Sequence, residues 1–186
     1  MNIDIQLSDS LILLRPPKFD DAFAIHQAVR ESLAELHPWM DWATNVYDAS
    51  STRRWLEHVL VAWEHSSSFH FVISSASTGE FIGGCSVDGI NEKERFCNLG
   101  YWVRTSRTGQ GIASRAIRLA AKFAFESVKL SRAEIVVAVE NRASQRAAEK
   151  AGAQFVRALI SRVVIRSDVH DGVMFSLTPA DFERSG

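Results

Sequence analysis

Three apolar segments between Phe69 and Val103, separated by short turn-forming sequences, constrain the fold of this chain most strongly. The segments FHFVISS and EFIGGCSVDGI flank the turn-forming residues Ser77–Gly79, which is the pattern of a β-hairpin. A third run of the same kind, RFCNLGYWV, follows at Arg95–Val103. The sequence therefore predicts an antiparallel meander of three strands in the middle of the chain.

Helices and further strands are predicted on both sides of this meander. Before it, the patterns predict a strand at Ser10–Pro17, a helix from Asp20 that Pro38 breaks, and a helix from about Ser51 to Glu64 with Ser51 or Thr52 as N-cap. After it, they predict an amphipathic helix at Ile112–Phe123, a strand at Glu134–Glu140 buried on both faces, an alanine-rich helix at Ser144–Ala151 that ends at Gly152, and two final strands, FVRALISRVVIR and GVMFSL. This order predicts a mixed sheet with helices on both faces. A chain of 186 residues with 46% hydrophobic residues fits one domain over residues 1–186.

The composition excludes several classes of partner. The formal net charge is −1, so nothing favours nucleic acid or membrane lipid as a bulk partner. No apolar run approaches the roughly 18 residues that a membrane span needs, and the six histidines show no ligand spacing. Two cysteines, Cys85 and Cys97, without a secretory segment favour a reducing compartment. We therefore expect a cytoplasmic protein that uses no metal, nucleic acid or membrane.

The segment TGQGIASRAI, Thr108–Ile117, places two glycines directly before a predicted helix. The first turn of a helix leaves N–H groups unpaired at the positive end of the helix dipole, and glycines let these amides approach an anion. A tight strand-to-helix turn is an equally simple explanation. Two other phosphate motifs do not fit. A Walker A loop needs Gly-Lys-Ser/Thr where this chain has Gly111-Ile112-Ala113, and a first Rossmann strand does not follow an antiparallel meander.

Two longer segments, LGYWVRTSRTGQGIASRAI and VENRASQRAAEKAGAQF, resemble the GNAT superfamily of N-acetyltransferases, specifically its RimJ/RimL branch. The similarity spans nearly the whole chain, from LILLRPPKFDDAFAI to DGVMFSL. It implies a single-domain GNAT fold of the α/β (α+β) class, with a mixed, mostly antiparallel twisted sheet of about six to seven strands. It also implies direct transfer of acetyl from acetyl-CoA to a primary amine in a ternary complex, most simply the N-terminal α-amine of a ribosomal protein.

The resemblance assigns residues to acetyl-CoA. In the family, the pyrophosphate lies on the amides of a loop written Gln/Arg-x-x-Gly-x-Gly/Ala, whose first position is Thr108 here, a departure that makes Arg107 a candidate replacement cation. The end of the Tyr-Trp-Val strand is expected to pair with pantetheine and to stabilise the oxyanion through one amide. Asn141 matches an asparagine that binds the CoA arm, although an N-cap role is the alternative. The implied cofactor-binding residues are Trp102, Val103, Thr108, Gly109, Gln110, Gly111, Ile112, Ala113, Ser114 and Asn141.

The same resemblance gives an incomplete set of catalytic groups. Ser144 matches a serine that protonates the departing CoA thiolate as general acid, with a solvated surface serine as the alternative. An α-amine has a pKa near 7.7–8.0 and arrives mostly as ammonium, so a general base is needed as well. Some members carry a glutamate where this chain has Val164 and Ile165, so the base is unknown. The candidate groups are Asp88, Glu94, His70, His170 and Asp171.

The segment HPWMDW is predicted to border the acceptor cleft through Trp39, Asp41 and Trp42, unless its aromatic residues only anchor a loop between helices. The acceptor is either a protein N-terminus or a small amine such as a polyamine, an amino acid or an antibiotic, because the same fold serves many amines. A non-catalytic acyl-CoA-binding module is the alternative of another class, since the glutamate is missing. A homodimer is compatible with the composition, which does not require one.

Overall fold

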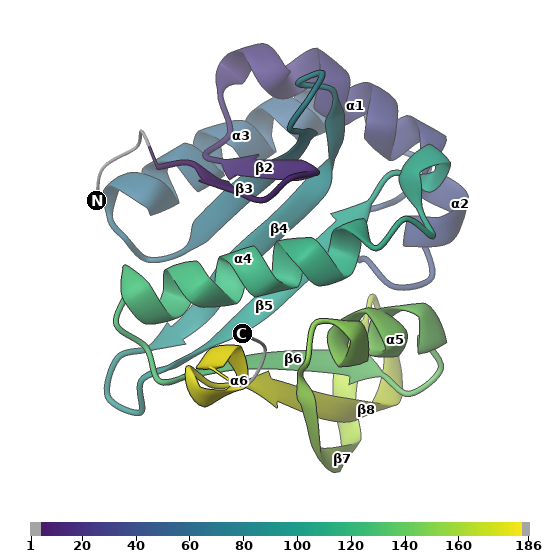
Figure 1. Cartoon of the computed structure of the whole chain (residues 1–186). Helices are drawn as coiled ribbons and strands as arrows, with labels where there is room; N and C mark the ends of the chain where they lie inside the picture. The colour runs from purple at the N-terminus through teal and green to yellow at the C-terminus, as the bar shows by residue number, and fades with distance from the viewer. Residues whose placement is uncertain (1–4, 184–186) are drawn as a thin grey trace.

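The computed structural model describes residues 5–183. Within this range eight strands form one sheet in the order β1-β2-β3-β4-β5-β6-β8-β7 (Figure 1). Neighbouring strands run antiparallel except β5 and β6, which run parallel. The strands are β1 (Leu7–Ser8), β2 (Ile12–Arg15), β3 (Phe69–Ser75), β4 (Phe81–Asn91), β5 (Phe96–Val103), β6 (Arg132–Ala138), β7 (Gln154–Ile165) and β8 (Asp168–Leu177).

The predicted meander, β3 to β5, and the mixed sheet are confirmed, and the expected count of six to seven strands is too low. β1 is the strand that sequence reasoning missed, because two residues cannot display a period of two. β6 is less enclosed than predicted. Its residues Ala133, Ile135 and Val137 are buried, whereas Glu134 and Val136 on the other face are half-buried.

Helices cover both faces of the sheet (Figure 1). The helices are α1 (Ala22–Glu31), α2 (Leu33–Leu36), α3 (Ala49–Glu64), α4 (Ile112–Glu126), α5 (Arg142–Lys150) and α6 (Ala180–Glu183), with 3₁₀ turns η1 (Phe19–Asp21) and η2 (Thr105–Arg107). Because side chains alternate along a strand, Val72 packs with α1 and α3 while Phe71 packs with α4. Phe123 of α4 meets Phe71 edge-on, with ring centroids 5.2 Å apart. The sheet is therefore the middle layer of three. None of the helices within the described residues is long and apolar enough to cross a membrane.

The ends of the helices depend on polar caps. The N-cap of α3 is Asp48, and not Ser51 or Thr52 as predicted. The Asp48 carboxylate accepts a hydrogen bond from the Ser51 amide at 2.7 Å. Thr52 is buried instead and its hydroxyl bonds to the Tyr47 hydroxyl at 2.8 Å. The predicted end of the alanine-rich helix is confirmed, since Gly152 follows α5 with a φ of +90°.

The single parallel contact in the described sheet is short. β5 and β6 pair only through Phe96 with Arg132, Cys97 with Ala133, and Asn98 with Glu134. Beyond Asn98 the two strands separate, and β5 continues to Val103 paired with β4 but no longer with β6. We call this separation the seam. It opens one sheet edge in the middle of the molecule, next to the N-terminus of α4.

Candidate active site

The N-terminus of α4 has the geometry of an anion site. Gly111 is the N-cap residue of α4 and has a φ of +75°, and Gly109 has a φ of +76°. Both values lie in the left-handed region that favours glycine. A Cβ atom on Gly109 would meet nothing within 4 Å, so the space beside this residue is open. The predicted residues Gly109–Ser114 therefore present unpaired N–H groups, although the side chain of Ile112 is buried in the core and only its backbone is available.

A cleft of about 500 Å³ adjoins this loop and is basic. It is lined by Asp9, Gln110, Gly111, Ser114, Arg115, Arg118, Leu119 and Lys150. Arg115 pairs with Asp9 at 2.8 Å, and Arg118 donates to the Ala151 carbonyl at 3.0 Å. Three cations against one carboxylate, beside the positive end of a helix dipole, favour a ligand that carries several negative charges. Sequence reasoning missed these cations, because they come from two helices.

Arg107 does not face this site. Its guanidinium pairs with Glu80, which also accepts from Arg104 at 3.2 Å. Arg104 pairs in turn with Glu31, and the Glu31 carboxylate accepts from the Ser106 amide at 2.9 Å. These contacts attach η2, which precedes the glycine loop, to the end of α1. Arg107 thus helps to hold the loop from outside, and the hydroxyl of Thr108 donates to the Thr105 carbonyl within η2 at 2.9 Å.

The contacts between η2 and the end of α1 predict that the free energy of unfolding depends on pH. Hydrogen bonds from Arg104 and Ser106 lower the pKa of Glu31 from 4.5 to about 2. The folded pKa lies below the unfolded one, so the contribution of Glu31 to stability is present above about pH 4.5 and is lost as the pH falls towards 2. We expect Glu31→Gln to lower the free energy of unfolding at pH 7 by no more than about 1 kcal/mol, because the pair is partly exposed, and to remove part of the acid dependence.

Urea unfolding at pH 7 and at pH 3 measures both effects. Glu126→Gln is the matched control, since Glu126 lies in an exposed pair with Lys122 at 3.8 Å and should change the stability less. Equal pH dependence in the wild type and in Glu31→Gln would contradict the assignment.

The seam places a free backbone amide opposite a hydroxyl pair. The Arg104 amide donates to the Ile82 carbonyl of β4 at 2.8 Å, and backbone directions alternate along a strand, so the Val103 amide points away from β4 and into the seam. Across the seam, the Tyr101 hydroxyl lies 2.8 Å from the Ser144 hydroxyl and donates to the Ser144 carbonyl at 3.0 Å. Burial raises the pKa of Tyr101 to about 12, so this phenol keeps its proton at neutral pH.

Asn141 is the N-cap residue of α5, which is the role that the sequence offered beside binding of the CoA arm. Its side chain accepts a hydrogen bond from the Ser144 amide at 3.1 Å. This contact uses only the amide oxygen, so the Nδ2 group is not engaged by the cap. The cap also fixes the start of α5 and with it the Ser144 hydroxyl that Tyr101 contacts. Two predicted residues that are three positions apart therefore meet at the seam, and Tyr101 joins them as a residue that sequence reasoning did not assign.

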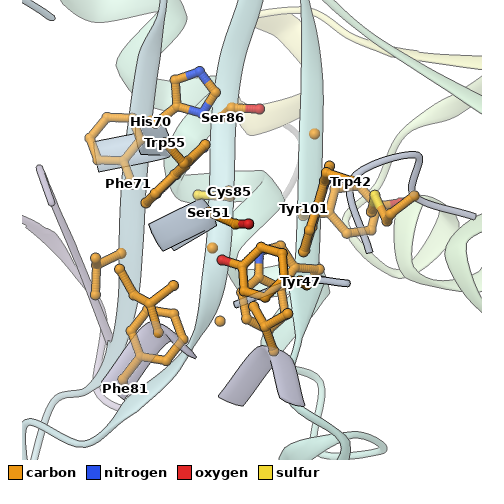
Figure 2. A pocket seen from close by; sticks show the side chains of 18 of the residues that line it. Trp42, Tyr47, Ser51, Trp55, His70, Phe71, Phe81, Cys85, Ser86 and Tyr101 are labelled. Carbon is orange, nitrogen blue, oxygen red and sulfur yellow. The ribbon is translucent and has the colours of Figure 1, made fainter. Parts of the chain in front are cut away.

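A second cleft of about 510 Å³ lies on the α1–α3 face of the sheet (Figure 2). Its lining is mainly aromatic and apolar, and its floor is formed by β3, β4 and β5. Tyr101 and Trp102 line it, so the cleft reaches the same strand that borders the seam. The aromatic residues of the lining are Trp42, Tyr47, Trp55, His70, Phe71, Phe81, Tyr101 and Trp102.

The predicted acceptor segment divides between two positions. Trp42 lines this cleft and meets Trp102 edge-on, with ring centroids 5.9 Å apart. Trp39 and Asp41 are not among the lining residues. The Asp41 carboxylate instead accepts from the amide of Arg166, whose guanidinium donates to the His37 carbonyl at 2.7 Å. Asp41 thus connects the loop between α2 and α3 to the turn between β7 and β8.

The candidate bases also separate. His70 and Asp88 line the second cleft, on the α1–α3 face of the sheet. Glu94 lies in the turn between β4 and β5, where its amide donates to the Asn91 side chain at 2.9 Å. Asp171 accepts from the Ser161 amide in β7 at 2.8 Å, and His170 lies 3.8 Å from Glu140. In residues 5–183, no group of three or more His, Cys, Asp or Glu side chains is arranged to hold a metal ion.

The chain is similar in sequence to known acetyltransferases. Residues 12–154 match the sequence model of a family described as acetyltransferase (GNAT) domain. YdaF of Bacillus subtilis (strain 168), assigned as a ribosomal N-acetyltransferase, is 26% identical over 174 residues, which are 92% of both chains. The ribosomal-protein-serine acetyltransferase of Escherichia coli (strain K12) is 24% identical over 149 residues, 80% of this chain and 82% of that protein.

A solved structure shows the same fold. RimL, the ribosomal L7/L12 α-N-protein acetyltransferase in complex with coenzyme A, superposes with a TM-score of 0.85 at 22% identity. The match covers 94% of this chain and 98% of that one. The two proteins therefore share their overall fold.

Proposed function

The chain belongs to the family of GNAT acetyltransferase domains, and we propose that it transfers acetyl from acetyl-CoA to the N-terminal α-amine of a ribosomal protein. The observation that carries this proposal is the position of the glycine loop of α4 beside an open seam that borders an aromatic cleft. The glycine loop would hold anions, the seam would offer strand backbone without a partner, and the aromatic cleft would have room for an acceptor. With a ribosomal acceptor, the reaction takes place in the cytoplasm.

The glycine loop and the basic cleft fit the phosphates of acetyl-CoA. The amides from Gly109 to Ser114 would hold the pyrophosphate at the positive end of α4. Arg115, Arg118 and Lys150 would neutralise its charges from the adjoining cleft. Thr108 at the family's Gln/Arg position is then compensated by cations on the helices, and not by Arg107.

The seam fits the pantetheine arm and the thioester. An extended arm that lies between β5 and β6 would pair with strand backbone that has no partner there, as an added strand does. The Val103 amide points into this space and would stabilise the oxyanion that forms when an amine attacks the thioester. The Ser144 and Tyr101 hydroxyls lie across the seam and would supply a proton to the departing sulfur.

The proposed acceptor is supported by the related proteins, one of which is named a ribosomal N-acetyltransferase and another a ribosomal-protein-serine acetyltransferase. The aromatic cleft suits the first residues of an extended peptide, because flat rings provide large apolar contacts while Ser51, Thr44 and Ser86 offer hydrogen-bonding groups. Acetyl-CoA and the acceptor would enter from opposite faces of the sheet and meet at β5.

Acetylation of a matched peptide pair tests the function. The first peptide has a free α-amine and a lysine, and the second has the same sequence with a blocked α-amine, so that only the lysine is available. With purified protein and acetyl-CoA, we expect mass spectrometry to find acetyl on the α-amine of the first peptide and none on the second. Equal modification of both peptides, or acetylation of spermidine alone, would contradict the α-amine specificity.

A further inference from the structure

The cleft on the α1–α3 face contains a polar row made of His70, Ser86 and Asp88. His70 of β3 is paired in register with Ser86 of β4, and Ser86 is paired with Gly100 of β5. Figure 2 shows the imidazole of His70 next to Ser86, at one end of the cleft. Of the residues that line the cleft, His70 and Asp88 are the two that were candidates for the general base.

Asp88 is already engaged as a carboxylate. Its Oδ2 atom accepts from the Ser86 hydroxyl at 2.7 Å, and its Oδ1 atom accepts from the Asn98 side-chain amide at 3.1 Å. Both carboxyl oxygens of Asp88 are thus held by groups of the protein itself. This makes His70 the candidate for exchanging a proton with a bound amine.

His70 is held in place and is neutral at pH 7. Trp55 of α3 contacts the imidazole edge-on, with ring centroids 6.0 Å apart and perpendicular planes. Burial lowers the pKa of His70, the charge of Asp88 acts in the opposite direction, and His58 of α3 lowers it further. Arg54, also on α3, is the other charged group that lines the cleft. A neutral imidazole has one nitrogen with a free lone pair, as a base requires.

Two glycines in the floor let this row pack closely against the strands. A Cβ atom on Gly100 would lie 2.7 Å from the Ser86 hydroxyl, and a Cβ atom on Gly84 would lie 2.9 Å from the Trp102 indole nitrogen. The cleft itself has a volume of about 510 Å³, which is room enough for an amine, and His70 lines it. An amine bound in the cleft next to His70 can reach the imidazole directly or through one water.

We propose that His70 is the general base that takes a proton from the α-ammonium of the acceptor, with Asp88 stabilising the imidazolium that results; this inference rests on the proposed acetyl transfer. The freed nitrogen lone pair forms the C–N bond to the thioester carbonyl carbon, and the C–S bond breaks. The sulfur receives the second proton of the nitrogen by way of the Ser144 and Tyr101 hydroxyls. His70 then returns its proton to the solvent, so each turnover releases one proton.

The size of the effect follows from the acidity of the acceptor. With a pKa near 7.7–8.0, roughly a tenth of an α-amine is already unprotonated at pH 7. We expect His70→Gln to lower kcat/KM for the peptide about tenfold at pH 7, with the difference closing above about pH 8.5. The affinity for acetyl-CoA, measured by calorimetry, should not change, because His70 lies on the acceptor face of the sheet.

A second acceptor separates a base from a merely structural residue. The same peptide with a hydrazide in place of its α-amine is unprotonated at pH 7 and needs no base before it attacks. His70→Gln should acetylate this analogue at nearly the wild-type rate. His58→Gln is the matched control, because His58 is exposed on α3 near His70 and should leave both rates close to wild type.

The outcomes are distinct. A wild-type rate of His70→Gln on the ordinary peptide at pH 7 would overturn the inference and leave the acetyltransferase function intact. An equal loss on the peptide and on the hydrazide at every pH would show that His70 only shapes the cleft, and would overturn it as well. If the wild-type protein acetylates no α-amine at all, it is the proposed function that fails.

Discussion

Gly111→Asp is expected to weaken the binding of acetyl-CoA by about 100- to 1,000-fold. Two unit charges about 4 Å apart interact by roughly 4 kcal/mol near a protein surface, and each 1.4 kcal/mol is a factor of ten in affinity. The substitution places a carboxylate at the N-cap of α4, where the proposed pyrophosphate lies. It does not crowd the protein itself, because the nearest atom to a Cβ on Gly111 is the Ser114 hydroxyl at 3.9 Å.

Two variants separate charge from backbone strain. Gly79→Asp introduces the same residue at a φ of +73° with nothing within 4 Å, in the turn between β3 and β4, and should bind acetyl-CoA as the wild type does. Gly111→Ala keeps the strain without the charge and should lose much less affinity than Gly111→Asp. Calorimetric titration measures all three. Wild-type affinity in Gly111→Asp would place the phosphates elsewhere and reduce the two glycines to a turn.

Ser144→Ala is expected to lower kcat about 100-fold without changing the affinity for acetyl-CoA. General acid catalysis typically contributes a factor of about 100 to 10,000, and a thiolate leaves more readily than an alkoxide, so the lower end applies. Tyr101→Phe removes the other hydroxyl of the 2.8 Å pair and should cause a similar loss. If the two hydroxyls pass one proton, the double variant is no slower than either single variant, because residues that act as a unit are not additive.

A surface serine provides the control for this pair. Ser131 also donates its hydroxyl to a carbonyl, that of Arg95 at 3.0 Å, and Ser131→Ala should retain the wild-type kcat. Steady-state rates with a saturating peptide, together with calorimetry for acetyl-CoA, separate the chemical step from binding. A normal kcat in both Ser144→Ala and Tyr101→Phe would show that the thiolate leaves without an acid from this chain.

Local sequence signals predicted most of the elements correctly. The turn at Ser77–Gly79, the glycines before α4 and Gly152 after α5 each follow from conformational preferences within a few residues. Errors occurred where several neighbours compete for one role, as at the N-cap of α3, where Asp48, Ser51 and Thr52 are all good caps. The first of them takes the role, and the last is drawn into the core by its bond to Tyr47.

The part of the candidate site that consists of backbone groups in one short segment could be predicted from the sequence. The part in which side chains from distant segments meet could not. The glycine loop is local, so its residues could be named from the sequence. Arg107 is directed by Glu80, 27 positions away, and Asp41 by Arg166, 125 positions away. The pairing of His70 with Ser86 depends on strand register. No sequence period encodes contacts of this kind, because they arise only when the sheet forms.

The seam has a consequence for how such a chain can change over evolutionary time. Strands β5 and β6 part after three residue pairs, and beyond that point the exposed β5 edge consists of main-chain groups that every residue except proline carries in the same form. The Val103 side chain is therefore free to change, provided that the strand keeps its path and its separation from β6, whereas Tyr101 is constrained by its bond to Ser144. A binding edge made of peptide groups depends on the path of the strand. It therefore stays functional when residues whose side chains do not take part in the site are exchanged.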